Sequence, residues 1–183
     1  MIQISYTSMV VFISIIWCFV RLVCAIMNKR LSWKRELQLL LVYICIGVVA
    51  RFTFFPFSTV NGKIQPLIFE SAKAFPFRIN WIPLVNLLDY PETRDILINV
   101  IGNTEMFIPL GIVWPCVYKD LNKHWKILSA GIGFSLFIEI LQLPFCDRVS
   151  DIDDLLLNSL GFIIGYLLYI LVKFIQNKVK RNR

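Results

Sequence analysis

Acidic and amide side chains towards the C-terminal end of this chain have the spacing of a polar site. Asp151, Asp154 and Asn158 follow one another at intervals of three and four residues, ahead of Gly161 and Gly165. At about 100° per residue, these positions share one face of a helix. Carboxylates on one face can exchange protons with a substrate or bind Mg²⁺ or Ca²⁺, the candidate cofactors. Carboxylates also favour helix N-termini, so the alternative is that both aspartates are only helix caps.

A second polar pattern consists of Ser135, Glu139 and Gln142, at spacings of four and three residues. A carboxyl group in low-dielectric surroundings suits general acid–base catalysis, so Glu139 joins the two aspartates as a candidate catalytic residue. Ser135 and Gln142 are candidate substrate-binding residues. The alternative for Ser135 is a packing residue, because a serine inside a helix bundle is more often that than a nucleophile. The alternative for Glu139 is a purely structural ion pair with Arg51 or Arg148.

Asparagine and arginine side chains complete the set of candidate substrate-binding residues. Asn103 ends a stripe of three polar residues that begins at Asp95 and repeats every four positions. Asn103 and Asn158 are expected to bind the polar part of a substrate, although Asn103 could also be only a hydrogen-bonding link between helices. Arg51 and Arg148 could hold a phosphate or a carboxylate through bidentate contacts. Each of these roles requires that several helices come together.

Membrane-spanning helices must position these residues, because the composition excludes a soluble domain. The 183 residues are 57% hydrophobic and only 17% charged, whereas a soluble domain is about 45–50% apolar. At about 20 residues per span, the chain has room for at most about six helices with short loops, and its apolar runs indicate five. We predict an all-α polytopic membrane protein that forms a single membrane domain over 1–183. Its expected spans are 4–27, 36–56, 95–118, 127–145 and 154–174, and its expected interfacial loop is 57–94.

The charges predict the orientation of these spans. The chain has a net charge of +7, and 12 of its 19 basic residues fall in the segments 28–35, 119–126 and 173–183. These segments lie on the same side of a five-span chain, so the positive-inside rule places them in the cytoplasm and the N-terminus outside. The basic charge is thus a topology signal, and we expect no nucleic-acid partner. Six polar residues then fall in the outer halves of their helices, namely Arg51, Asn99, Asn103, Glu139, Gln142 and Asn158. Their shared depth predicts one cavity open to the outside of the cell membrane.

Four motifs of this chain resemble, in the same order, the signature blocks of the VanZ-like family over about residues 45–172. They are N-x2-P-L from Asn80, N-x3-F-x-P-x-G from Asn103, S-x3-E-x2-Q from Ser135, and R-x2-D-x2-D-x3-N-x2-G-x3-G from Arg148. Each motif alone is weak, and together they are specific. Two positions depart from the family pattern, because Leu84 replaces the usual Phe and Glu105 stands where an apolar residue is usual.

The resemblance implies a cell-envelope membrane protein, because the namesake of the family is linked to low-level teicoplanin resistance in Gram-positive bacteria. It implies no particular reaction. One hypothesis is an enzyme acting on an amphiphilic or lipid-linked cell-wall substrate at the outer leaflet. The second is a non-catalytic protein that binds a glycopeptide, a lipopeptide or a membrane lipid at the membrane surface. A small-molecule transporter is a third and weaker hypothesis, and the oligomeric state is left open.

Overall fold

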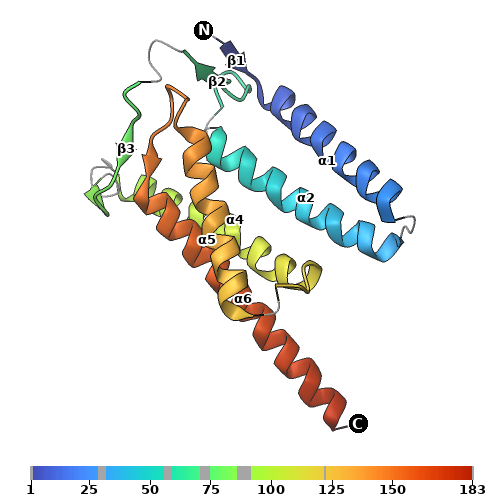
Figure 1. Cartoon of the computed structure of the whole chain (residues 1–183). Helices are drawn as coiled ribbons and strands as arrows, with labels where there is room; N and C mark the ends of the chain where they lie inside the picture. The colour runs from blue at the N-terminus through green and yellow to red at the C-terminus, as the bar shows by residue number, and fades with distance from the viewer. Residues whose placement is uncertain are drawn as a thin grey trace. The chain divides into compact units, whose positions relative to one another are not determined.

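Five long helices dominate the part of the chain that the structure describes. This computed structural model describes residues 2–28, 32–55, 59–70, 75–85, 92–121 and 123–182. Its long helices are α1 (Tyr6–Asn28), α2 (Trp33–Phe54), α4 (Thr93–Val117), α5 (His124–Gln142) and α6 (Ile152–Arg181) (Figure 1). All five are long and apolar enough to cross a bilayer. The predicted all-α architecture with five candidate spans is therefore confirmed, while the sides on which the termini lie stay a prediction.

Prolines determine two of the helix ends. α2 stops just before Phe55, which is extended at φ −123° and ψ 142°, because a residue that precedes a proline, here Pro56, is driven out of the helical region. α5 ends at Gln142, short of the expected 145, because Pro144 restricts the residue before it in the same way. α6 continues to Arg181, beyond the expected 174. Neither proline nor glycine interrupts its second half, and basic side chains suit a helix C-terminus.

The chain groups into two compact units. The first unit comprises Met1–Ile79 and Leu141–Ser150, and the second comprises Asn80–Ile140 and Asp151–Arg183. Two short strands, β3 (Ile79–Asn80) and β4 (Ser150–Asp151), pair as a two-stranded sheet. The chain passes from one unit to the other within these strands. The expectation of a single membrane domain over the whole chain stays a prediction.

The first unit contains a helical hairpin made by α1 and α2 (Figure 1). The hydroxyl oxygens of Ser14 and Tyr43 are 2.6 Å apart, and the rings of Trp17 and Tyr43 have centroids 5.4 Å apart. Further along α1, Arg21 Nε donates to a carboxylate oxygen of Glu36 at 2.9 Å, and the two side chains form an ion pair. The antiparallel hairpin thus pairs two opposite charges inside candidate membrane spans.

A second contact region of the first unit gathers segments that are far apart in the sequence. Strand β1 (Ile2–Ile4) pairs antiparallel with β2 (Leu67–Phe69). Phe69 also forms a β-bridge with Phe145, whose ring lies edge-on to that of Phe54 at 6.3 Å. The first apolar run of the chain, which we expected to be helical from residue 4, therefore begins as a strand, and the helix starts after it.

In the second unit, α4 and α6 approach each other so closely that their backbones touch. A Cβ atom added to Gly161 would overlap the carbonyl oxygen of Thr104, and one added to Gly165 would overlap that of Ile108. Gly111 of α4 lies in the same way against the backbone of α6. Residue numbers rise together on both helices, so α4 and α6 run parallel. The G-x3-G spacing on α6 makes this contact possible, because glycine lets two helix backbones approach closely.

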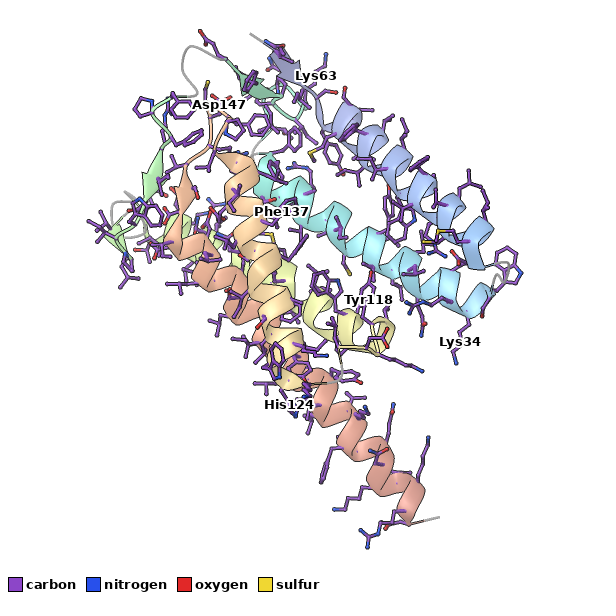
Figure 2. The ribbon with its side chains drawn as sticks, in the orientation of Figure 1. Lys34, Lys63, Tyr118, His124, Phe137 and Asp147 are labelled. Atoms are coloured by element: carbon purple, nitrogen blue, oxygen red, sulfur yellow. The ribbon has the colours of Figure 1, made fainter. Side chains whose placement is uncertain are left out.

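α5 contacts α6 through side chains rather than through backbone atoms. A Cβ atom added to Gly131 of α5 would overlap the ring of Phe162 on α6, so that ring fills the space beside the glycine. The ring of Trp114 on α4 packs edge-on against the same Phe162 ring, with centroids 5.6 Å apart. At the beginning of α5, His124 Nδ1 and the hydroxyl oxygen of Tyr166 are 2.7 Å apart (Figure 2). Aromatic groups therefore occupy the interior of this three-helix unit.

Candidate polar site

Asp151 is the N-cap of α6 and the centre of a hydrogen-bond network in the second unit. Its backbone is extended at φ −121° and ψ 129°, and its Oδ1 accepts the backbone N–H of Asp153 at 2.9 Å. The same oxygen accepts a side-chain N–H of Asn80 at 3.0 Å. The backbone N–H of Asp151 donates to Glu139 Oε2 at 2.9 Å. Asp151 therefore caps α6, and the cap is joined to a β3 side chain and to α5, while the expected catalytic role of Asp151 stays a prediction.

Asp154 links the first turn of α6 to α4. Asn103 Nδ2 donates to Asp154 Oδ1 at 2.6 Å and to Asn99 Oδ1 at 3.3 Å. Asn99 and Asn103 lie one turn apart on α4, on the face that their spacing predicts. Because α4 and α6 run parallel, both helices bring polar side chains to the same end of the unit. Asn103 is therefore an interhelical link, and its expected role in substrate binding stays a prediction.

Three candidate residues of the second unit are almost completely buried. The exposed fraction is 4% for Glu139, 0% for Ser135 and 1% for Asn158. Within the described ranges, Ser135 Oγ and both polar atoms of the Asn158 amide lack a hydrogen-bond partner. An unsatisfied buried donor or acceptor costs about 1–3 kcal/mol, so each such group in a native structure needs a physical explanation.

The other three candidates lie in the first unit, where they cap the C-terminal end of α2. Gln142 Nε2 donates to the carbonyl oxygen of residue 53 at 2.7 Å, and Arg148 donates to that of residue 54 through Nε at 3.1 Å and Nη2 at 2.7 Å. Arg51 Nη1 donates to the carbonyl of residue 55 at 3.2 Å. The last carbonyls of a helix have no intrahelical donors, so these side chains satisfy them. Their expected binding of a phosphate or carboxylate stays a prediction.

Asp153 is a site residue that the spacing argument left out. It is 5% exposed, and both of its carboxylate oxygens accept the backbone N–H of Leu84 at 2.9 Å. Leu84 has a φ of 68°, in the left-handed region that costs an ordinary residue about 1–2 kcal/mol. The contact fastens the loop after Pro83 to the first turn of α6. The signal in the sequence was the N-x2-P motif at Asn80, which marks a turn but does not reveal its partner.

The carboxylates of the second unit offer few free ligands for a cation. One oxygen of Asp151 and one of Asp154 already accept side-chain N–H groups. Among the residues that the structure describes, no three His, Cys, Asp or Glu side chains are grouped closely enough to hold a metal ion. Mg²⁺ and Ca²⁺ take about six to eight oxygen ligands, so substrate oxygens or water would have to complete the shell. The expected Mg²⁺ or Ca²⁺ site stays a prediction.

Known proteins resemble this chain over most of the region that carries the candidate residues. A family model described as VanZ/LLP1 matches residues 40–173. Protein VanZ of Enterococcus faecium is 29% identical over 99 residues, which cover 54% of this chain and 60% of that protein. The chain therefore spans about three fifths of the length of this relative. No solved structure matches.

Proposed function

Because this chain belongs to the VanZ/LLP1 family, we propose that it is a multi-pass cell-membrane protein that binds an amphiphilic molecule at the outer leaflet. The polar head of a lipid-linked cell-wall precursor, or of a lipoglycopeptide such as teicoplanin, engages Glu139, Asn103, Asp151 and Asp154. The hydrogen-bonded network at the N-terminal end of α6 is the observation that carries the proposal. The cellular outcome is increased resistance to teicoplanin.

The surroundings of the network favour an amphiphile over a fully water-soluble ligand. Ile140 follows Glu139 on α5 and is 53% exposed, and Leu156 lies two residues after Asp154 on α6 and is also 53% exposed. An acyl chain can lie against such apolar faces, because both are expected to face lipid, while its head group reaches the polar network. Teicoplanin carries an acyl chain, so the resistance linked to the family namesake agrees with a ligand of this kind.

A drug-susceptibility panel tests the proposal. Wild type, Glu139→Gln and Asp154→Asn are expressed at equal membrane levels in a Gram-positive host and challenged with teicoplanin and with vancomycin, which lacks the acyl chain. Both substitutions keep an oxygen for the hydrogen bonds from Asp151 and Asn103, while the charge is lost and the second oxygen becomes an NH2 group. We expect wild type to protect selectively against teicoplanin and both variants to lose this protection.

Glu105→Gln is the matched control for the panel. Glu105 is a glutamate of α4 in the same unit, and its side chain is exposed. It should protect as well as wild type, because the proposal assigns it no contact with the ligand. If wild type leaves teicoplanin susceptibility unchanged, the resistance proposal fails. If Glu105→Gln is as defective as Glu139→Gln, loss of any glutamate in this unit impairs protection and the network has no specific role.

A membrane enzyme is the second candidate function, and the burial of Glu139 favours it. A carboxyl group that is 4% exposed and adjoins a polar network can serve as a proton donor and acceptor for a bound substrate. Mass spectra of lipid extracts from cells with wild type and with Glu139→Gln separate the two candidates. A lipid or cell-wall product that is present only with wild type supports an enzyme. A binder leaves the two extracts identical.

A further inference from the structure

Two buried polar side chains of the second unit are not used by the network at the end of α6. Ser135 is 0% exposed and Asn158 is 1% exposed. Neither the Ser135 hydroxyl nor the Asn158 amide nitrogen and oxygen has a hydrogen-bond partner in the described part of the chain. Ser159, the residue next to Asn158, shows the usual solution, because its hydroxyl donates to the carbonyl oxygen of Leu155 at 2.7 Å. Ser135 and Asn158 therefore differ from Ser159, whose hydroxyl is paired within its own helix.

Two contacts between α5 and α6, one on each side of Ser135 and Asn158, indicate that these two residues lie at the same level of the helix pair. On one side, Gly131 of α5 lies against the ring of Phe162 on α6. On the other side, Glu139 accepts the backbone N–H of Asp151. Residue numbers thus rise on α5 as they fall on α6, so the helices are antiparallel. Ser135 lies one turn after Gly131 on α5, and Asn158 lies one turn before Phe162 on α6. Because the helices are antiparallel, we expect the two side chains to lie at the same level and to face a shared position.

The aromatic packing explains why the polar groups do not satisfy each other through a tighter contact. α4 and α6 meet through their glycines, whereas α5 is held off α6 by the ring of Phe162 beside Gly131. Trp114 and Phe134, with centroids 5.4 Å apart, pack on the side towards Phe162. The position between Ser135 and Asn158 thus has aromatic rings on one side and the polar network on the other. One of these rings is the indole of Trp114, whose buried Nε1 also lacks a partner among the described residues.

We propose that Ser135 and Asn158 form a buried subsite that binds one neutral group able both to donate and to accept hydrogen bonds, such as a hydroxyl or an amide. The inference rests on the proposed binding of an amphiphile and names the part of its head group that enters deepest. An amide and a hydroxyl together offer donors and acceptors but no charge. A phosphate buried there would lack the opposite charge that such a group needs. In this proposal the ligand supplies the hydrogen-bond partners that the described residues do not offer to Ser135 and Asn158.

Thermal unfolding of the full chain in lipid nanodiscs gives the first half of the test. Ser135→Ala and Asn158→Leu remove polar groups to which the described residues offer no hydrogen-bond partner. We expect both variants to unfold at the wild-type temperature or up to about 4 °C above it. Ser159→Ala is the matched control, since it removes a hydroxyl that is already paired. If Ser135→Ala and Asn158→Leu instead unfold several degrees below wild type, the two groups are structural, and the subsite is refuted.

A small amphiphile gives the second half of the test. Decyl glucoside has an uncharged head with several hydroxyls, and decyl phosphocholine has the same chain on a charged head without a hydroxyl donor. Below their micelle-forming concentrations, decyl glucoside should raise the unfolding temperature of wild type and Ser159→Ala but not of Asn158→Leu, and decyl phosphocholine should raise none. An equal rise for wild type and Asn158→Leu, or no rise for either, would falsify the subsite.

The two proposals fail in distinguishable ways. Suppose that wild type gives no teicoplanin protection, yet the decyl glucoside shift depends on Asn158. The resistance proposal is then wrong, and the subsite stands as a site for another hydroxyl-bearing amphiphile. If instead Glu139→Gln abolishes teicoplanin protection while Ser135→Ala and Asn158→Leu keep it in full, the network carries the function and the subsite does not contribute to it.

Discussion

At the scale of single residues, Asp151 joins three parts of the second unit through one cap. Its Oδ1 accepts N–H groups from Asp153 and from the Asn80 side chain, and its backbone N–H donates to Glu139. The carboxylate thus caps α6 and binds the Asn80 side chain, and the backbone N–H of the same residue donates to α5. Asp151 thus both stabilises the helix end and positions Asn80 and Glu139. A substitution that keeps its hydrogen bonds and one that removes them are both needed to measure its contribution to stability.

Asp151→Ala should lower the free energy of unfolding by about 2 kcal/mol. Loss of an N-cap side chain costs about 0.5–2 kcal/mol, and the Asn80 amide loses its acceptor as well. Asp151→Asn keeps an acceptor oxygen and should lose less than half as much. Asp147→Ala is the control, because Asp147 is exposed in a turn. Thermal unfolding in nanodiscs measures all three, and an Ala variant as stable as the Asn variant would show that the cap contributes little.

Spacing along a helix predicted part of this site and could not predict the rest. Residues one turn apart share a face whatever they touch, so the stripe from Asp151 to Asn158 could be found in the sequence. The contact between Asp153 and Leu84 joins a carboxylate to a backbone N–H 69 positions away in the chain. Such a contact has no sequence period and depends on how a loop folds back. Arg148 was likewise identified as a binding residue, although the structure shows it donating to the end of α2.

At the scale of helices, glycine positions decide which pairs of helices come close. Gly161 and Gly165 of α6 each face a backbone carbonyl of α4, so a methyl group has no space at either position. Gly133 of α5 differs, because an added Cβ atom there would meet nothing within 4 Å. Close helix contacts in membranes depend on such small residues, since lipid provides no hydrophobic drive between helices.

Gly161→Ala should destabilise the protein, whereas Gly133→Ala should not. The methyl group at residue 161 must push α4 and α6 apart, and overpacking of this kind costs about 1–3 kcal/mol. At residue 133 the same change meets no neighbouring atom. Alanine should stabilise the helix there by up to about 1 kcal/mol, because it has less conformational freedom to lose on folding than glycine. Unfolding temperatures in nanodiscs provide the measurement. Equal effects of the two variants would mean that α4 and α6 are not held together at these glycines.

The ion pair between α1 and α2 gives a prediction that needs a double variant. Arg21 and Glu36 are 23% and 30% exposed in the isolated chain, and both lie in or at the ends of apolar helices. Arg21→Leu leaves the carboxylate without this partner in low-dielectric surroundings, and we expect a loss of about 1–3 kcal/mol. Adding Glu36→Leu should restore most of it, because no charge then remains to be buried. Unfolding in nanodiscs tests this, and a double variant less stable than the single one would contradict it.

The positions of the helices follow from composition, but several of their ends and partners do not. Runs of about 20 apolar residues are the signal of a span, and Pro56 and Pro144 explain where α2 and α5 stop. The pairing of β1 with β2 is different. It joins residues 2–4 to residues 67–69, and the sequence of neither short segment indicates which segment it pairs with. Local chemistry therefore determines where elements begin and end, whereas pairing of distant segments requires the structure.

At the scale of the whole molecule, the distribution of charge connects the fold to the proposed function. The basic segments 28–35, 119–126 and 173–183 fall on alternate connections, so the rule that places basic loops in the cytoplasm assigns the N-terminal end of α6 to the outside. The proposed binding of a teicoplanin-like amphiphile depends on this assignment, because such a drug acts outside the membrane. The orientation is an inference from sequence, and it can be tested independently of any ligand.

Reporter fusions at the C-terminus test the orientation directly. Green fluorescent protein folds in the cytoplasm, and alkaline phosphatase is active only outside it, so each reports one side. Fused after Arg183, the first should fluoresce and the second should be inactive, because the basic residues of 173–183 resist transfer across the membrane. Replacing the basic residues of 119–126 by glutamine should weaken this bias, and the same replacement at Lys63, in the predicted outer loop, should not. An active C-terminal phosphatase would put Asp151 and Asp154 on the cytoplasmic side, where the network could no longer meet a drug that acts at the outer leaflet.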